Sequence, residues 1–466
     1  MAIWRQPDLE TLLGGPLDAE GLTQETIERL VDEAARESEV LDFKGALDPP
    51  TKGPRTAWLS EQEFAKDVAA FANHRGGLLL VGIEDADGVA TKAPGWALSS
   101  TTEVEERRLR QALVNYLSPI TYCDFIWVER SPSGRFLGVV IPPSPRSPHA
   151  VMSQTGEGRT ALRYPVRHGA GTDWLGESEV AARYRRRLDA QGAEASRLEL
   201  VIANGIASLD HADGVWLFVA VVPEAPVPGR LDARAVDRID KWHRSNGVLS
   251  PLGRSIPAHG RGIAAPGRVV FTGSRLSSGD DETEVRDALV ELYVDGGAFA
   301  ATPTADRTTE DDDGRQVGEI TLVDDGFLLV DEALTWCASE AGAWGTARVV
   351  MGFMEAGSSD GSLGAPIELV QSDAGTVRRV RPSRRLASQV RAEAVADLSA
   401  TLAVQQRLAV LHQLLAGILQ WFGLAEPAQV RPDGSLVTRQ FTMARHQEVS
   451  SWAQEHGVEA ERLGGT

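Results

Sequence analysis

A short stretch near the N-terminus, ESEVLDFKGAL, begins at Glu37 and places acids and a lysine beside apolar residues. In a strand, Asp42 and Lys44 share one face while Leu41 and Phe43 share the other. If the preceding helix ends at Glu37 and the chain then turns, the Glu37 carboxylate approaches that of Asp42. Grouped carboxylates are typical ligands of Mg²⁺ or Mn²⁺, and a nearby lysine can hold a phosphate or activate a water.

A third carboxylate follows the apolar run LLLVGIE at 78–84, which predicts a strand buried on both faces. Asp85 comes directly after this strand. If the strand lies beside the one at 39–47, then Glu37, Asp42 and Asp85 meet at one edge of a sheet. The plainer interpretation is that the acids are solvated or structural and that Asp42 simply pairs with Lys44. Spacing alone favours this plainer interpretation.

The elements that must position these residues alternate between helices and strands. In the first 190 residues the apolar periodicity and the capping residues predict helices at 23–37, 60–75, 102–117 and 177–188, and strands at 39–47, 78–84, 121–129, 136–142 and 161–166. This mixture, with hairpin-like pairs late in the segment, indicates an α+β fold rather than a doubly wound sheet.

The composition changes near residue 198. Beyond it the pattern predicts strands at 198–206, 214–222, 268–273, 317–330 and 347–354, helices at 232–244, 283–293 and 331–341, and a long helical stretch at 384–423. We therefore expect three regions: an N-terminal domain at 1–190, a second α+β domain at 191–380 and a helical C-terminal region at 381–466.

The net charge, the two cysteines and the apolar stretches limit which sites and which location are expected for this protein. The 466 residues carry a formal net charge of -19, with most of the acid excess after residue 190, so any nucleic-acid contact is expected in the N-terminal domain. The two cysteines, Cys123 and Cys337, form no CxxC pair and predict no zinc site. No leader-like or membrane-spanning apolar stretch occurs, so a cytoplasmic protein is expected.

Several motifs together resemble the Schlafen AlbA-type domain, a nucleic-acid-binding family that also carries divergent-AAA labels. The resemblance covers about 20–188. The motifs that carry it are Glu37 with Asp42-Phe43-Lys44, Ala70 to Asn73, Gly76-Gly77, Gly82 to Asp85 with Gly88, SPHAV at 147–151 and LRYPVRHGAGT at 162–172. Two departures are an Asp at position 42 where the family has Glu, and a Pro and a His inserted in the last motif.

The resemblance implies two alternative functions. Some members are metal-dependent endoribonucleases that act on structured RNA such as tRNA; their pattern makes Glu37, Asp42 and Asp85 both metal ligands and catalytic residues, assisted by Lys44, with Mg²⁺ or Mn²⁺ as cofactor. A role in stress or phage defence would fit such an activity. Many bacterial members are instead treated as non-catalytic DNA-binding, regulatory or scaffold proteins. No GxxxxGK[ST] motif occurs, so no ATP site is expected.

Basic residues late in the N-terminal domain are the candidates for contacting the nucleic-acid partner, whether RNA or DNA. They are Arg163, Arg167, His168, Arg183, Arg185, Arg186 and Arg187. The alternative is that the RYRRR run is a solvated helix end that complements the helix dipole. Because Schlafen nucleases pair two such lobes and this chain has one, a homodimer is the simplest route to a second lobe.

Overall fold

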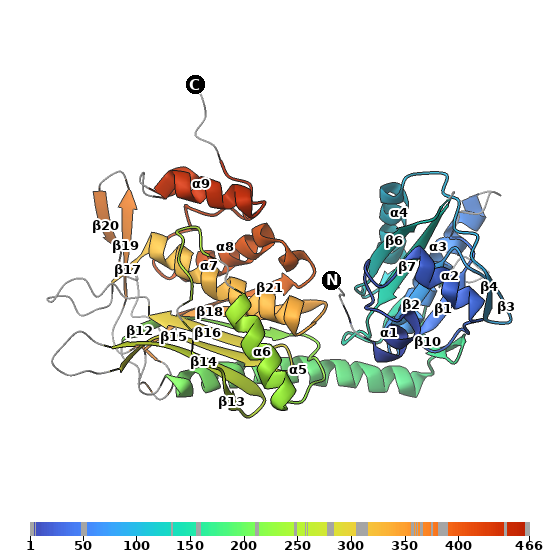
Figure 1. Cartoon of the computed structure of the whole chain (residues 1–466), viewed down its shortest axis with the longest axis horizontal. Coiled ribbons are helices and arrows are strands. Elements are labelled where there is room, and N and C mark those ends of the chain that lie inside the picture. Colours follow the sequence, from blue (N-terminus) through green and yellow to red (C-terminus); the bar gives the residue numbers. More distant parts are fainter. Residues whose placement is uncertain are drawn as a thin grey trace, which may run out of the picture. The chain divides into compact units, whose positions relative to one another are not determined.

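The computed structural model describes residue 4 and residues 6–47, 54–131, 134–154, 160–209, 214–246, 249–256, 258, 260–276, 284–303, 316–355, 358, 360, 362–363, 367–373, 376–380, 390–441 and 445–461. The chain forms two compact units, Met1–Gly192 and Ala193–Thr466, and the division falls within helix α5 (Glu177–Ser208) (Figure 1). Both units mix helices and sheets, which confirms the predicted α+β class.

A four-stranded sheet in the order β1-β2-β7-β6 forms the centre of the first unit. Strands β1 (Leu41–Lys44) and β2 (Gly77–Val81) are parallel, whereas β7 (Arg135–Ile141) pairs antiparallel with both β2 and β6 (Asp124–Glu129). The other elements are α1 (Pro7–Leu13), α2 (Gln24–Asp32), α3 (Pro54–Ala72), β3 (Glu84–Ala86), β4 (Val89–Lys92), α4 (Thr102–Tyr116), β5 (Leu117–Ser118), β8 (Ala150–Gln154), β9 (Thr160–Arg163), β10 (Pro165–His168) and β11 (Gly171–Trp174).

Helix α3 covers one face of this sheet, and that face is where the charged residues of β1 lie. Leu79 and Val81 pack with the apolar side of α3 in one buried cluster. In the β1–β2 register Asp42 lies beside Leu79, and Lys44 beside Val81. Since side chains alternate across a strand, Asp42 and Lys44 point toward α3. The strand parity predicted from the sequence is therefore right, but α3 buries Asp42 on this face, whereas the Lys44 side chain stays 35% exposed.

The connection around Glu37 differs from the expected one. Helix α2 ends at Asp32, not at Glu37, and Ala34 then has a positive φ of 50°. Glu37 consequently lies in the connecting segment before β1. Strand β2 likewise ends at Val81, where Gly82 with φ 101° turns the chain toward β3.

A seven-stranded antiparallel sheet in the order β13-β14-β15-β16-β12-β18-β21 forms the centre of the second unit. Its strands are β12 (Val215–Pro223), β13 (Ile263–Ala265), β14 (Arg268–Leu276), β15 (Glu284–Tyr293), β16 (Ala298–Pro303), β18 (Thr346–Glu355) and β21 (Arg391–Asp397). Helices α6 (Ala233–Ser245), α7 (Glu319–Thr335) and α8 (Val404–Gln420) lie on one face, and the second half of α5 packs on the other (Figure 1).

The remaining elements of the second unit are short. They are β17 (Gln316–Gly318), the π-helix η1 (Trp336–Glu340), β19 (Glu368–Asp373), β20 (Thr376–Val380), the 3₁₀ turns η2 (Ala400–Leu402) and η3 (Thr438–Gln440), and α9 (His446–Glu455). In the described part of the chain, no helix has both the length and the apolar character that crossing a membrane requires.

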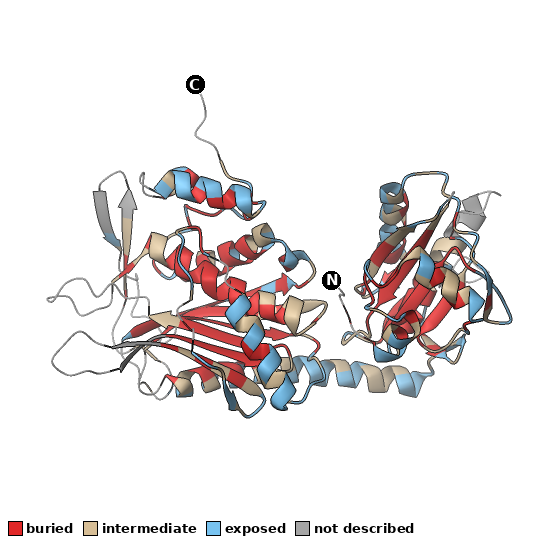
Figure 2. Ribbon diagram, viewed as in Figure 1, coloured by how far each residue is buried: buried red, intermediate tan, exposed pale blue. Residues whose placement is uncertain are grey.

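Three predicted elements of the second unit are wrong, and a fourth is confirmed only in part. The strand expected at 198–206 is part of α5, the strand at 317–330 is mostly α7, and the helix at 283–293 is β15. The helical stretch at 384–423 contains β21 and α8, while residues 381–389 lie outside the described residues. Helix α7 is buried on nearly every side, so its apolar run lacks the helical period (Figure 2).

Candidate functional site

The Asp42 carboxylate is the centre of a buried ion-pair network beneath α3. Asp42 is 3% exposed, its Oδ2 lies 2.8 Å from Lys44 Nζ, and its Oδ1 lies 3.4 Å from Arg167 Nη1. Lys44 Nζ also lies 3.5 Å from Oδ2 of Asp67, which α3 carries. The pKa of the Lys44 ammonium is raised because the charges of Asp67 and Asp42 outweigh the effect of burial, which acts in the opposite direction.

Arg167 belongs to this buried network and does not lie at the surface. Its side chain is 2% exposed, its Nη2 donates to the Ser38 carbonyl at 2.9 Å, and its guanidinium lies 4.7 Å from the centre of the Phe71 ring. Strand β10 brings it under α3 opposite Asp42. This burial places the Arg167 guanidinium away from a surface ligand, and its expected role in binding phosphate stays a prediction.

Asp67 was missed as a site residue, although the sequence carries a signal for it. It follows Phe64 by three residues and precedes Phe71 by four, so all three lie on the apolar side of one helix. An acid on that side is buried when the helix packs, and burying a carboxylate costs free energy unless a cation pairs with it. Burial raises the pKa of Asp67 from 3.8 to about 6, and the charge of Asp42 adds to this rise while Lys44 opposes it.

Glu37 joins β1 to the turn between β3 and β4. Its N–H donates to the Gly88 carbonyl at 2.8 Å, and its Oε1 accepts from the Phe43 N–H at 3.0 Å. Burial raises the pKa of the Glu37 carboxyl, and the charges of Asp42 and Asp85 add to the rise. Asp85 itself is exposed, and its Oδ2 accepts from the Gly88 N–H at 3.2 Å. The three predicted acids therefore share one electrostatic neighbourhood.

These acids do not fit a divalent cation as they are arranged. Both Asp42 oxygens face cationic side chains, Lys44 and Arg167, and so the carboxylate is already neutralised. Among the described residues, no group of three or more His, Cys, Asp or Glu side chains is placed to hold a metal ion. The metal-ligand and catalytic roles expected for Glu37, Asp42 and Asp85 stay predictions, and in this arrangement Asp42 acts as a structural residue.

Asn73, just after α3, holds the segments that lie next to this network. It is 1% exposed; its Nδ2 donates to the carbonyls of His149 and Pro165, and its Oδ1 accepts from the His149 N–H at 2.7 Å. Its own carbonyl accepts from Arg183 of α5, whose Nη1 also lies 3.2 Å from Ser147 Oγ. Through these bonds the end of α3 fixes β10 and the first turns of α5.

The other predicted basic residues lie at or near the surface around β9, β11 and α5. Arg163 is exposed and its guanidinium lies 3.6 Å from the centre of the Trp174 ring, while the exposed His168 lies 2.8 Å from Asp173. On α5, Arg185 and Arg186 are exposed and Arg187 is half-buried. We call the set Arg163, Tyr164, Trp174, Tyr184, Arg186 and Arg187 the β9–α5 surface. Around α5, Arg187 lies about 60° from Tyr184 and Arg186 about 160° from it, so the set spans two sides of the helix.

The RYRRR run is not a single cationic stripe. On a helix, residues three and four apart share a side, so Arg186 and Arg187 lie on the same side as Arg183. Arg185 lies about 200° away from Arg183 at 100° per residue, on the opposite side. The three consecutive arginines therefore cannot all face the same bound phosphate chain.

Residues 37–173 match the model of the family described as Schlafen, AlbA_2, so the first unit contains a Schlafen AlbA_2 domain, which confirms the resemblance noted in the sequence. A search of curated proteins finds no match.

A solved structure, the DIP2311 protein from Corynebacterium diphtheriae, is similar at 20% identity and a TM-score of 0.23. The match covers 39% of this chain and 29% of that chain, so this chain spans less than a third of that relative. A likeness at this level carries no structural argument.

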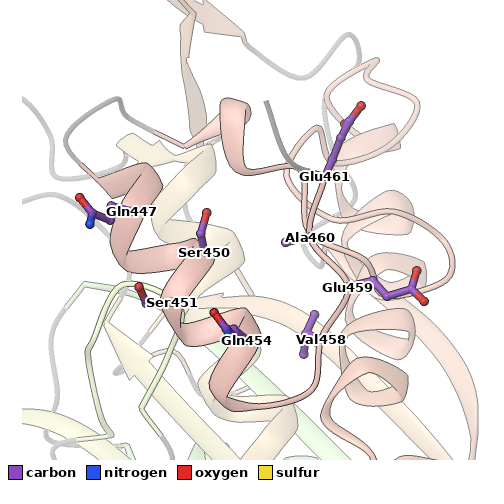
Figure 3. A pocket seen from close by; sticks show the side chains of 8 residues that line it. All are labelled: Gln447, Ser450, Ser451, Gln454, Val458, Glu459, Ala460 and Glu461. Carbon is purple, nitrogen blue, oxygen red and sulfur yellow. The ribbon is translucent and has the colours of Figure 1, made fainter. Parts of the chain in front are cut away.

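The second unit has a cavity of about 510 Å³ between α9 and residues 458–461 (Figure 3). Four uncharged polar side chains of α9 line it, namely Gln447, Ser450, Ser451 and Gln454, and the charged residues described in its wall, Glu459 and Glu461, are acidic. Glu461 Oε2 lies 2.8 Å from Arg431 Nη2, and the residues described in the lining include no cation that would attract a polyanion.

The buried pairing of Arg167 predicts a large loss of stability in the Arg167→Ala variant. We expect a decrease of about 3–5 kcal/mol in the free energy of unfolding, because the variant leaves a buried carboxylate short of a cation. Urea unfolding measures the loss, and hydrogen exchange of the β1 and β2 amides assigns it to the first unit. The control is Arg163→Ala, an exposed arginine nearby, which should change stability by about 0.5 kcal/mol or less. Equal effects of the two variants would contradict the network.

The raised pKa of Asp67 predicts a specific dependence of stability on pH. The folded protein holds this proton more tightly than the unfolded chain, so the contribution of Asp67 to the free energy of unfolding is largest at acid pH and falls as pH rises from about 4 to about 6. Asp67→Asn should remove this decline, which is on the order of 3 kcal/mol. Asp189→Asn, which changes an exposed acid, should leave it in place. The same pH profile in wild type and Asp67→Asn would show that Asp67 titrates normally.

Proposed function

We propose that this chain is a nucleic-acid-binding protein and that its β9–α5 surface makes the contacts. The observation that carries the proposal is the cationic character of this surface in the unit whose residues 37–173 match the Schlafen, AlbA_2 family. Arg163 and Arg186 are exposed and Arg187 is half-buried. Guanidinium groups are favoured for phosphate because they present several fixed donors and always carry charge. A local basic surface of this kind binds a polyanion even on a chain whose net charge is -19.

The crowding of these cations supports the same proposal. The pKa of the Arg183 guanidinium is lowered from its usual value, first by burial and then by the positive charge of Arg186. A cation that lowers the pKa of a neighbouring cation marks a region of positive potential. A bound phosphate would relieve this repulsion, which favours an anionic partner over an uncharged one.

Metal-dependent cleavage of RNA is the second candidate function. The supporting observation is that the charges of Asp42 and Asp85 both raise the pKa of Glu37, as expected for acids that converge on one place. Against it stands the pairing of Asp42 with Lys44 and Arg167 beneath α3. We therefore place binding first and treat the network as structural. A homodimer that supplies a second lobe, and a location in the cytoplasm, stay predictions.

The helical positions of the arginines predict different effects on salt-dependent binding. The Arg186→Ala/Arg187→Ala double variant of the full chain should flatten the dependence of log K on log salt concentration by about one to two units, since each lost phosphate contact removes roughly 0.7–0.9. Arg185→Ala, on the other side of α5, is the matched control and should leave the slope unchanged. Fluorescence anisotropy with a labelled oligonucleotide at several salt concentrations measures both. A slope that changes only with Arg185→Ala would place the nucleic acid on the wrong side of α5 for this proposal.

The structural role of Asp42 predicts that binding does not depend on a metal. Total tRNA incubated with the protein should be retained to the same extent in Mn²⁺ and in EDTA, and should stay intact in both. A gel-shift assay measures binding, and a denaturing gel measures cleavage. Cleavage in Mn²⁺ that EDTA and Asp85→Asn both abolish would contradict this account and would establish the nuclease instead.

A further inference from the structure

We propose that the β9–α5 surface binds unpaired nucleobases by stacking, so that the preferred ligand is a single-stranded nucleic acid or the single-stranded part of a folded RNA. This inference rests on the proposed nucleic-acid binding and names the form of nucleic acid that the surface takes. It is carried by aromatic side chains that lie exposed among the cationic ones.

The first stacking position is the pair formed by Trp174 and Arg163. Trp174 ends β11 and is 39% exposed, although large aromatic side chains are mostly buried in folded proteins. The Arg163 guanidinium lies 3.6 Å from the centre of its ring. An indole and a planar guanidinium are both surfaces on which nucleobases stack, and the guanidinium also attracts the phosphate of the same nucleotide.

The second stacking position is the pair formed by Tyr164 and Tyr184. The ring centres are 6.3 Å apart and nearly perpendicular, and Tyr184 is 39% exposed. The hydrogen bond between the two hydroxyl groups, followed by burial, raises the pKa of Tyr164 to about 12, so this phenol stays uncharged near neutral pH and does not repel phosphate. A T-shaped pair leaves the more exposed ring available to a base.

The two positions are held next to each other by the backbone. Tyr164 follows Arg163 directly, and the Tyr164 carbonyl accepts from the N–H of Leu175, which follows Trp174, at 2.8 Å. Consecutive residues are separated by about 3.8 Å between Cα atoms, so adjacent backbone carries the two aromatic pairs. Arg183 anchors the adjacent turn of α5 to the Asn73 carbonyl, which fixes Tyr184 relative to β9.

This arrangement favours unpaired bases over a duplex and over a protein partner. In a duplex the faces of the bases are already stacked on each other, so exposed aromatic rings gain little from it. Exposed apolar side chains nearby, Leu162 at 54% and Leu188 at 66%, are compatible with a protein partner as well. Arg163, against the Trp174 ring, and Arg187, about 60° from Tyr184 around α5, favour the nucleic acid, because each stacked base brings a phosphate that needs a cation.

The test measures the affinity of the full chain for labelled 20-nucleotide single strands of DNA and RNA and for the matching duplexes, by fluorescence anisotropy at one salt concentration. We expect tighter binding of the single strands. Trp174→Ala should weaken single-strand binding by roughly 5- to 150-fold, the effect of losing one stacked base, and should leave duplex binding unchanged. Trp174→Phe, which keeps a ring, should retain most of the single-strand affinity.

The matched control is Trp421→Ala, which removes a tryptophan of nearly equal exposure, 37%, from the second unit. It should bind the single strands as the wild type does. Two results would overturn the stacking inference and leave the proposed function standing. The first is that the wild type prefers the duplex. The second is that Trp174→Ala and Tyr184→Ala both bind single strands as tightly as the wild type does. A wild type that binds neither form would overturn the proposed function and this inference together.

Discussion

The pairing of the buried Asp42 carboxylate with two cations is the interaction on which the first unit depends. A carboxylate placed under a helix costs free energy unless opposite charges accompany it. Lys44 comes from the same face of β1, and Arg167 comes from β10, 125 residues further along the chain. The requirement for both cations therefore fixes β1, α3 and β10 relative to one another.

The consequences of this pairing reach the surface of the unit. Strand β10 carries Arg167 inward, and the segments on either side of it carry Arg163 and Trp174 outward. Asn73 ties the end of α3 to β10 and accepts a hydrogen bond from Arg183, so the first turns of α5 take their position from the same helix. The buried charges of Asp42 and Arg167 are thus paired within the protein, while Arg163 lies at the surface, where the proposed polyanion would meet it.

The sequence predicted the local features of the site better than their surroundings. The alternation in LDFK placed Asp42 and Lys44 on one face, and the motifs identified the domain. The pattern did not show that α3 covers that face, because covering is decided by contacts between segments far apart in the chain. Asp67 carried a detectable signal as an acid on an apolar helix side. Arg167 carried none, since a buried arginine and an exposed one look alike in a sequence.

The wrong secondary-structure predictions in the second unit have a related cause. Helix α7 is buried around most of its circumference, so EITLVDDGFLLV reads as an apolar run without a helical period. Strand β21, with the sequence RAEAVAD, is rich in residues that favour helices, yet it alternates between buried and exposed positions and completes the edge of the sheet beside β18. Tertiary packing overrides the intrinsic preference in this strand.

The central claim is that the acids are internal and that the β9–α5 surface binds nucleic acid. The most direct test is hydrogen–deuterium exchange of the full chain, measured with and without a saturating single-stranded oligonucleotide. The account predicts that bound oligonucleotide slows exchange in residues 160–188 and leaves residues 37–44 and 84–88 unchanged, because Asp42 is enclosed beneath α3. Slowed exchange centred on residues 37–44 and 84–88, with none in 160–188, would contradict it and would place the nucleic acid at the acids.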